Sequence, residues 1–530
     1  MSAHLKALIV ILVLGGTVLW MARRFAVEGV VDPADFRRRT LAWIAVTMAA
    51  FLAHNYWIYA LLTAPLIAVA GKRDSNRLCL FLFLMFAIPP FRVDLRTGGT
   101  LWLQMHHFRW LALLLLLPAY LALRRTPGVI PFGRTVTDKF IAGYMALLFL
   151  VDASNATTLT STVRNAIEVF LDIFLLYYVA SRGLRTLGDY RDGLFCYVIA
   201  VLIMSPMAVF EAVRSWLLYA SIESSMNLPF SGLGLMLRRG DGILRAQVTS
   251  GQSIVLGYIM ATALAFLVFL RPSFRQHRHW LAVVVVLSLG LVAAMSRGPW
   301  VGAAGLAVVL LFTGARVQSR VGRALLAAMV LLPLLLMTPQ GQKMIDYLPF
   351  VGTVEAQNVQ FRQRLADVTL SVLANFPLFG TWGIGYHPDL EQMRGGDGII
   401  DMVNTYLAVA LNMGVVGLTL FAAPFAITVG AIIRRLWIEK KDRDSEWYRL
   451  GRGLLACLTA ILITIGTVSS IVAVPQIYWI VVGLAAGYLR LPRTEATTEA
   501  VAAGLRGPAR SARFPQRAAP LAGGWRGPAR

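Results

Sequence analysis

The sequence has few charged residues for its length. Of its 530 residues, 15% are Asp, Glu, Lys or Arg, whereas 57% are apolar or aromatic. A soluble protein carries about 25% charged and about 45–50% apolar residues, so much of this chain needs a solvent other than water. The composition excludes a soluble enzyme and favours an integral membrane protein.

Cysteine is also scarce. Cys79, Cys196 and Cys457 are the only three, and each lies in or beside an apolar run, without a CxxC or Cys/His spacing. This pattern argues against a disulfide framework and against a zinc site. We expect neither a metal nor another cofactor.

What the chain has in abundance is apolar runs bounded by charge. A helix needs about 20 residues to cross a hydrocarbon core of about 30 Å. The runs predict an all-α polytopic membrane protein with about 14 transmembrane helices, and the stretch 41–70 is either two short helices or one long tilted helix. The runs are 5–20, 41–53, 56–70, 78–90, 108–123, 140–152, 164–180, 193–219, 251–270, 280–295, 299–313, 323–338, 402–433, 453–472 and 475–489.

Basic residues outnumber acidic ones by 50 to 27, and most of them lie in every second connection between these runs. Short cytoplasmic loops of membrane proteins are enriched in Lys and Arg. We therefore predict a multi-pass membrane protein with cytoplasmic connections at 23–39, 71–77, 124–139, 181–192, 271–279, 314–323 and 434–452. The intervening connections, including a long one at 338–400, are predicted to lie on the opposite side of the membrane.

This map divides the chain into five predicted regions. The tail is rich in Ala, Gly, Pro and Arg, a composition typical of disorder. The regions are N-terminal transmembrane helices (1–160), central transmembrane helices with arginine-bearing outer turns (161–338), a large periplasmic loop domain (339–400), C-terminal transmembrane helices (401–490) and a disordered basic cytoplasmic tail (491–530).

Two arginines stand at predicted outer turns. Arg245 precedes small polar residues that lead into the N-terminus of the helix predicted from 251, and Arg297 lies in a short Ser-Arg-Gly-Pro interruption between two runs. Gly298 in that interruption is expected to permit an unusual backbone angle. An outer arginine runs against the usual charge bias and needs a partner. For Arg297 that partner is a phosphate group or a structural ion pair, and for Arg245 an anion or lipid phosphates.

The long outer connection holds further candidates. Arg362 and Arg364 are expected either to bind acidic ligand groups or to pair with the acids of the same loop. Loops of this length without apolar runs usually bind or cover something.

Within the apolar runs, Glu168 and Asp172 lie one helical turn apart, and we expect them to pair with Arg164 or polar neighbours.

Three motifs follow one another along the chain: Ser-Arg-Gly at 296–298, Pro-Leu-Phe-Gly-Thr-Trp-Gly-Ile-Gly at 377–385 and Asn-Thr-Tyr-Leu at 404–407. Their order resembles that of the O-antigen ligase and O-antigen polymerase family, and the resemblance covers residues 160–435. It implies a GT-C-like glycosyltransferase of the bacterial inner membrane. Such an enzyme takes a glycan from undecaprenyl diphosphate and joins it to an acceptor at the periplasmic face, without a metal.

The same resemblance assigns roles to residues. Arg245 and Arg297 match the family's two diphosphate-binding arginines. Asn404 and Tyr406 belong to the motif at the start of the last long run and are expected to bind substrate. The implied partners are the lipid-linked donor, a glycan acceptor, membrane lipids and other polysaccharide assembly proteins, and nucleic acid is not among them.

One position departs from the family pattern. Ligases of this family typically have His-Asn-x-Tyr-Leu, whereas this chain has Val403 before Asn404. Valine cannot accept a proton, so the candidate general bases are Asp401 and His387. The change favours a polysaccharide polymerase over a lipid-A O-antigen ligase.

The alternative class is a polysaccharide or lipid-carrier transporter or flippase, which would share the many helices.

Overall fold

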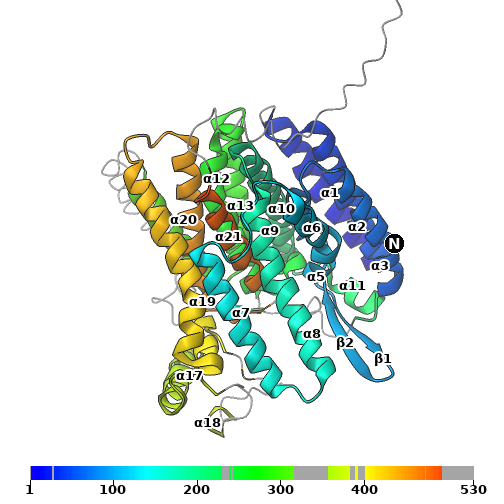
Figure 1. Ribbon diagram of the computed structural model, residues 1–530. Coiled ribbons are helices and arrows are strands. Elements are labelled where there is room, and N and C mark those ends of the chain that lie inside the picture. Colours follow the sequence, from blue (N-terminus) through cyan, green and yellow to red (C-terminus); the bar gives the residue numbers. More distant parts are fainter. Residues whose placement is uncertain are drawn as a thin grey trace, which may run out of the picture. The chain divides into compact units, whose positions relative to one another are not determined.

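The structure is a computed structural model of the 530-residue chain, and most of its described residues are helical (Figure 1). It describes residues 2–26, 29–228, 238–239, 243–314, 356–381, 388–391, 400, 402–471 and 473–491. The predicted span at 323–338, much of the predicted loop domain and the predicted tail beyond residue 491 lie outside the described residues.

The first half of the chain supplies helices of very different length. They are α1 (Ala3–Phe25), α2 (Pro33–Leu52), α3 (Tyr56–Arg73), α4 (Arg77–Leu84), α5 (His107–Leu111), α6 (Leu117–Arg125), α7 (Val136–Asn155), α8 (Leu159–Val169), α9 (Leu175–Gly183), α10 (Leu187–Arg214) and α11 (Ala220–Ser225). A π-helical turn, η1 (Ala112–Leu116), joins α5 to α6, and a second, η2 (Phe170–Phe174), joins α8 to α9.

The second half adds α12 (Ser253–Leu270), α13 (His277–Ala293), α14 (Arg297–Phe312), α17 (Ala356–Asn375), α18 (Pro388–Glu391), α19 (Thr405–Ile438), α20 (Glu446–Ile465) and α21 (Val474–Tyr488). Short 3₁₀ turns, η3 (Val248–Ser250) and η4 (Arg271–Ser273), precede and follow α12.

The stretch 41–70 forms two helices rather than one. His54 takes a positive φ of 49°, which breaks the helical path. The next residue, Asn55, caps α3 by accepting hydrogen bonds from the backbone of Trp57 and Ile58. Asn is among the preferred capping residues because its side-chain oxygen satisfies free N–H groups of the first turn.

Strands also occur, which the all-α prediction did not include. β1 (Arg92–Thr97) and β2 (Thr100–His106) pair as an antiparallel hairpin within a segment predicted to be a plain connection. A second, very short pair joins β3 (Arg238–Arg239) to β4 (Ile243–Leu244). The run predicted at 78–90 is helical only to Leu84, and the chain turns into the hairpin soon afterwards.

Among the described residues, six helices are long and apolar enough to cross a membrane. They are Ala3–Phe25, His107–Arg125, Leu187–Arg214, Ser253–Ser273, Thr405–Ile438 and Glu446–Ile465. The apolar helices α13, α14 and α21 are shorter. These helices support a multi-pass membrane protein.

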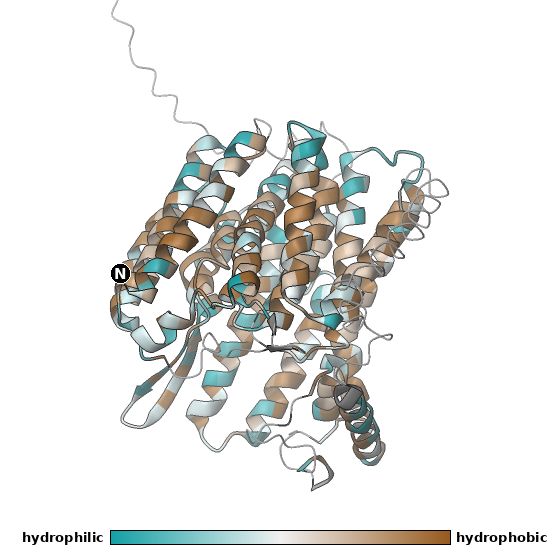
Figure 2. Ribbon diagram, turned by 180° about the vertical axis from the view of Figure 1, so that it is seen from behind, coloured by the Kyte–Doolittle hydropathy of each residue, from teal (hydrophilic) through white to brown (hydrophobic). Residues whose placement is uncertain are grey.

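The helices divide into an inner and an outer set. α10, α12, α20 and α21 bury most of their side chains, including Trp479, Tyr258 and Tyr190. α1, α3 and α19 instead expose large apolar residues such as Leu61 and Trp437. Figure 2 shows apolar residues along the middle of the helices and hydrophilic ones near many helix ends. An exposed apolar band of this kind is expected where helices face lipid.

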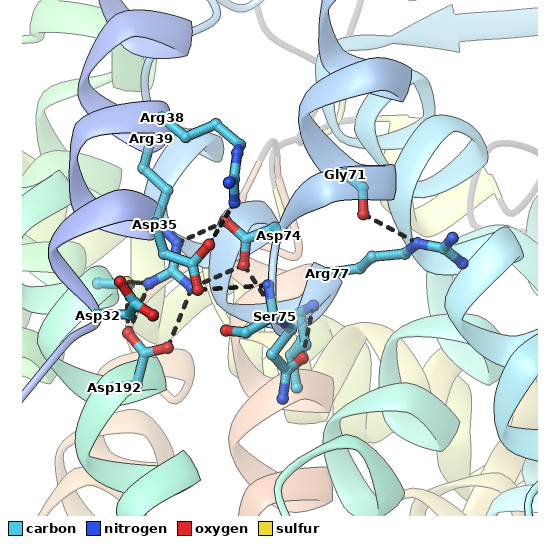
Figure 3. Close-up of polar contacts among 12 residues, drawn as sticks. Asp32, Asp35, Arg38, Arg39, Gly71, Asp74, Ser75, Arg77 and Asp192 are labelled. Atoms are coloured by element: carbon cyan, nitrogen blue, oxygen red, sulfur yellow. Dashed lines mark hydrogen bonds and ion pairs between the residues drawn. The ribbon is translucent and has the colours of Figure 1, made fainter. Parts of the chain in front are cut away.

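One end of the helical bundle gathers the connections predicted to be cytoplasmic, and we call it the basic end. At its centre the guanidinium of Arg39 in α2 lies between the carboxylates of Asp74 and Asp192, from the α3–α4 link and α10 (Figure 3). Nη2 lies 2.7 Å from Asp74 Oδ1, and the Arg39 side chain is fully buried. Burial raises the pKa of Asp74, and its hydrogen bonds from Arg39 oppose that rise.

Other contacts bring more of these connections to the basic end. Asn76 Nδ2 donates to the carbonyl of Gly183, and Arg191 pairs with Glu446 at 2.8 Å. Phe274, before α13, bridges to Ala26 at the end of α1. Segments far apart in sequence therefore meet at this end, as the alternation of basic loops predicts.

We call the opposite end the hairpin end, because β1 and β2 lie there together with α11 and α17 (Figure 1). It also contains the α7–α8 link at 156–158, the α13–α14 turn at 294–296, the start of α19 and the α20–α21 link at 466–473. The candidate residues in the described part of the chain lie at this end.

Candidate functional site

The α13–α14 turn positions Arg297 as the first residue of α14. α13 ends at Ala293, Met295 adopts a positive φ of 46°, and Ser296 occupies the N-cap position. Trp300 Nε1 donates to the carbonyl of Leu291 at 3.0 Å, which fastens the turn to α13. The expected tight turn is present, and the Arg297 side chain is half-buried.

Gly298 is required for close packing and not for an unusual backbone angle. We expected it to permit an unusual backbone angle, but the left-handed residue of the turn is Met295. A Cβ atom on Gly298 would lie only 2.2 Å from Thr467 Oγ1. Glycine is therefore needed for close packing, and this packing joins the Arg297 turn to the α20–α21 link.

The Arg245 segment runs beside the same turn. The backbone N–H of Ala246 donates to the carbonyl of Ala293 at 3.1 Å, so Arg245 is adjacent to a residue bonded to the end of α13. Arg245 is half-buried. α12 begins at Ser253, so the 3₁₀ turn η3 separates Arg245 from the helix N-terminus that the sequence suggested as its companion.

Glu211 holds the Arg245 segment in place, a role that sequence reasoning missed. Its carboxylate, 1% exposed, accepts backbone hydrogen bonds from Gln247, Val248 and Leu218, each at 2.9 Å. A buried charge is stable only when it is well hydrogen-bonded. Glu211 is thus a positioning residue, and its place near the end of a long apolar run was the available signal.

The start of α19 lies across the α20–α21 link from the Arg297 turn. Thr405 Oγ1 donates to the carbonyl of Val468 at 2.7 Å, and Ser469 Oγ donates to the carbonyl of Met402 at 2.9 Å. Together with the contact between Gly298 and Thr467, these bonds make the link the common neighbour of both elements. The fold therefore brings 296–298 close to 402–405, which are about a hundred residues apart in sequence.

The motif residues of α19 already have partners inside the protein. Asn404 Oδ1 caps the helix by accepting from the N–H groups of Tyr406 and Leu407. Tyr406 donates its hydroxyl to the carbonyl of Leu462 at 2.8 Å. The two candidate bases, Asp401 and His387, lie outside the described residues.

The glycine-containing turn after α17 inserts into a break in α19. Gly414 has φ 64° and ψ −164° inside that helix, and Gly380 has φ 69°. The N–H of Thr381 donates to the carbonyl of Leu411, and that of Val415 to the carbonyl of Pro377. A Cβ on Gly414 would lie 2.2 Å from a backbone oxygen of this turn. Only glycine permits this insertion, which replaces backbone bonds that the break removes.

Arg362 and Arg364 lie on α17 with exposed side chains. Leu365 and Val372 of the same helix pack into a small apolar cluster with Leu411. This cluster, which also contains Leu390 and Met402, fastens α17 to the start of α19. The two arginines therefore project from an anchored helix.

A buried charge group near the hairpin was also missed. Arg109 of α5 pairs with Glu168 at 3.0 Å and with Asp172 at 2.6 Å. Arg164, the partner we expected for these acids, instead donates to the carbonyl of Leu101 in β2. The pairing joins residues about sixty positions apart, so local spacing could not reveal it.

This charge group borders a cavity of about 460 Å³ between α7, α8, α19 and the start of α21. Polar lining residues are Asp152, Asn165, Asn412, Ser470 and Gln476, in addition to Arg109, Glu168 and Asp172. Arg245 and Arg297 are not among its lining residues. The structure therefore shows two neighbouring polar regions at the hairpin end, the arginine-bearing turns and this cavity.

The fold and these regions define a class, a multi-pass helical membrane protein with polar sites at one end of its bundle. Residues 281–422 match a family model described as O-antigen ligase, which supports the O-antigen ligase/polymerase family and confirms the resemblance stated above. The matched segment contains Arg297, the 377–381 turn, Asn404 and Gly414, whereas Arg245 precedes it. Comparison with curated proteins gives no match. The family implies a glycan-processing membrane enzyme with a lipid-linked glycan substrate and an acceptor.

Proposed function

We propose that the protein is an inner-membrane glycosyltransferase that polymerises glycan repeat units from an undecaprenyl-diphosphate donor. The observation that carries this proposal is the position of Arg297. It begins α14 in a turn held by Trp300 and Thr467, it falls inside the matched family segment, and the Arg245 segment is bonded to the same turn. A guanidinium is well suited to a diphosphate because it offers two parallel N–H donors.

The proposed reaction is an inverting displacement. The oxygen of an acceptor hydroxyl attacks the anomeric carbon of the donor sugar, and the bond from that carbon to the diphosphate oxygen breaks. The diphosphate leaves with the electron pair, and Arg297 and Arg245 stabilise its growing negative charge in the transition state. The hydroxyl proton passes to a general base, for which Asp401 and His387 are our candidates.

Other predicted site residues receive supporting roles in this proposal. Asn404 uses its oxygen to cap α19, so its amide NH₂ is the group we assign to substrate. Tyr406 supports the same helix start beside it. Arg362 and Arg364, exposed on α17, are proposed to contact the growing glycan.

We further propose that the basic end faces the cytoplasm and the hairpin end the periplasm. Arg39, Arg182, Arg191 and other basic side chains gather at the first end, as the positive-inside rule requires. The carrier diphosphate would then meet Arg297 at the outer surface of the bilayer. Val403 in place of the family histidine favours polymerase activity over transfer to lipid A, and no metal is required in this scheme.

The experiment that tests this function begins with cells lacking the protein. A polymerase substrate should accumulate there as undecaprenyl-diphosphate-linked repeat units, which can be extracted. Purified protein in proteoliposomes should then join these units into longer chains on the same lipid. Movement of the lipid across the bilayer without any lengthening would instead identify a flippase, and transfer of a single unit to lipid A would identify a ligase.

A further inference from the structure

The cavity between α7, α8, α19 and α21 has no part in the diphosphate chemistry proposed above. Its volume of about 460 Å³ falls within the range of small-molecule sites, which is about 300–1,000 Å³. α19 contributes Asn412, which lies two residues before the break at Gly414. The inserted turn at 377–381 therefore helps to fix this wall of the cavity.

One buried polar group of the cavity has no hydrogen-bond partner among the described residues. Gln476 is only 5% exposed, and within the described part of the chain its Oε1 makes no hydrogen bond. A buried acceptor of this kind costs free energy unless something else donates to it. Gln476 lines the cavity, and a rotation of its amide group would turn this oxygen toward a donor bound there.

The charge in the cavity selects against anions. Three carboxylates (Asp152, Glu168 and Asp172) border it with one arginine, and Arg109 is already paired with two of them. A phosphate placed here would meet this negative excess. Hydroxyl or ammonium groups would instead donate to the carboxylates and to the Gln476 oxygen.

The remaining wall is aromatic. Tyr144, Tyr478 and Trp479 line the cavity, and the Tyr144 and Trp479 rings lie 5.7 Å apart. Rings of this kind present a negative face to the weakly positive C–H groups of a sugar ring. An apolar wall opposite carboxylate and amide acceptors therefore suits a pyranose, which has C–H faces and a hydroxyl rim.

Two further observations mark the cavity as a built site. Asp172 lies in the π-helical turn η2, and the π-helical turn η1 follows α5, which carries Arg109. Such turns are rare and occur frequently at functional sites. β2 also contacts the charge group, because the backbone N–H of Gln104 donates to Glu168 and Arg109 donates to the Gln104 carbonyl.

The cavity lies near the Arg297 turn along the chain. Ser470 lines the cavity, whereas Thr467 packs against Gly298. Three residues of extended chain span at most about 10 Å, so the α20–α21 link connects the two regions over a short distance. One lipid-linked glycan can therefore contact both, with its diphosphate at the arginines and a sugar in the cavity.

We propose that this cavity is a saccharide subsite that binds one neutral or amino-bearing pyranose unit through Asn412, Gln476 and the adjacent carboxylates. The inference rests on the proposed function, since it assigns the sugar of that reaction to a place. The donor and the acceptor both contain such a sugar, and the experiment below distinguishes which of the two the cavity binds.

The test uses cysteine labelling in the full-length protein. The three native cysteines are at most 1% exposed, so Asn412→Cys introduces a reactive thiol in the cavity. The reagent is a trimethylammonium methanethiosulfonate. The probes are the repeat unit extracted as its undecaprenyl diphosphate, the same saccharide released by mild acid, and inorganic diphosphate. Thr97→Cys, on the exposed hairpin strand β1, is the matched control.

We expect the released saccharide at ten times its Kd to slow labelling of Asn412→Cys by about 10-fold, and diphosphate to leave it unchanged. Labelling of Thr97→Cys should not respond to any probe. Protection by both the intact donor and the released saccharide supports the subsite, and protection by the released saccharide alone assigns the cavity to the acceptor. Labelling unaffected by saccharide, or slowed by diphosphate, overturns the inference.

A kinetic measurement keeps the two proposals apart. In proteoliposomes Gln476→Leu should raise KM for the glycan about 10-fold, the effect of losing one contact of about 1.4 kcal/mol, with a smaller change in kcat. If wild-type protein lengthens glycans while Gln476→Leu has an unchanged KM and labelling is unprotected, the subsite is wrong and the function stands. If cells lacking the protein accumulate no lipid-linked glycan and wild-type protein lengthens none, both proposals fail.

Discussion

The basic end and the hairpin end both bury charged side chains, but they satisfy them differently. At the basic end, the fully buried guanidinium of Arg39 donates to two carboxylates, that of Asp74, which is also fully buried, and that of Asp192, which is 16% exposed. At the hairpin end, acids outnumber Arg109 around a cavity, and the Gln476 oxygen has no partner among the described residues. The first arrangement holds helices together, whereas the second leaves capacity for a ligand.

The difference gives a rule for reading the interior of this protein. A polar group whose partners lie on other helices, such as Asp192, links elements and contributes to stability. A polar group that lines a cavity without partners costs stability and is retained for binding. Substitutions at the two ends should therefore separate unfolding from activity.

The largest effect on stability is expected at the basic end. Arg39→Ala leaves the fully buried Asp74 and the partly buried Asp192 without their partner, and breaking a buried pair costs about 3–5 kcal/mol. Thermal unfolding in detergent should show a large fall in Tm. The neighbouring exposed residue gives the control, because Arg37→Ala should change stability by no more than about 0.5 kcal/mol. Equal effects of the two variants would contradict the proposed role of the pair.

A comparably large loss is expected where α19 is broken. Gly414→Ala adds a Cβ 2.2 Å from a backbone oxygen and strains a backbone at φ 64°, at a cost of about 2–4 kcal/mol. Gly430 in the same helix has open space around it, so Gly430→Ala should stabilise by about 1 kcal/mol. Unfolding curves of the two variants should move in opposite directions, and parallel shifts would refute the insertion of the 377–381 turn.

Glu211 should show a smaller, mixed effect. Glu211→Gln weakens hydrogen bonds to a charged acceptor, worth about 1.5–3 kcal/mol, and loosens the segment that holds Arg245. We expect kcat with the lipid-linked donor to fall about 10-fold while KM changes less, because Arg245 acts on the charge of the transition state. Arg214→Ala, exposed near the end of the same helix, is the matched control. A lower Tm with an unchanged kcat would mean that Glu211 is structural alone.

The smallest effect is expected at the surface of the basic end. Arg191 pairs with Glu446, but their side chains are 29% and 34% exposed. Pairs this accessible are screened by water and salt and contribute about 0–1 kcal/mol. Arg191→Ala should therefore shift Tm far less than Arg39→Ala does. Equal shifts would show that solvent exposure does not determine how much each ion pair contributes to stability.

Periodic and local features of the fold could be predicted from sequence. Apolar runs predicted the mostly helical architecture, for which six candidate spans occur among the described residues, and alternating basic loops predicted the shared basic end. Both signals depend on short stretches of chain. The Ser-Arg-Gly interruption likewise predicted the turn before α14. The criterion of long apolar runs marks only segments that can cross a membrane. The β1–β2 hairpin is too short and too polar to meet it and was therefore missed.

What could not be predicted depends on distant partners. Arg109 and Asp172 carry no local signal for one another, and the π-helical turn at Asp172 changes which face that residue occupies. Gly298 was correctly singled out for the wrong reason, because its neighbour Thr467 is known only from the fold. The cavity at Gln476 is lined by five separate segments of the chain, so its existence likewise could not be predicted from local sequence.

The most direct test of the account is turnover by Arg297→Ala in proteoliposomes supplied with the lipid-linked repeat unit. Arg297 begins α14 at the hairpin end, and the Tm of the variant is measured alongside to establish that it is folded. We predict a fall in kcat of the folded variant of about 10²–10³-fold, the usual cost of removing one group that stabilises a transition-state charge. Normal chain lengthening by the folded variant would contradict the account.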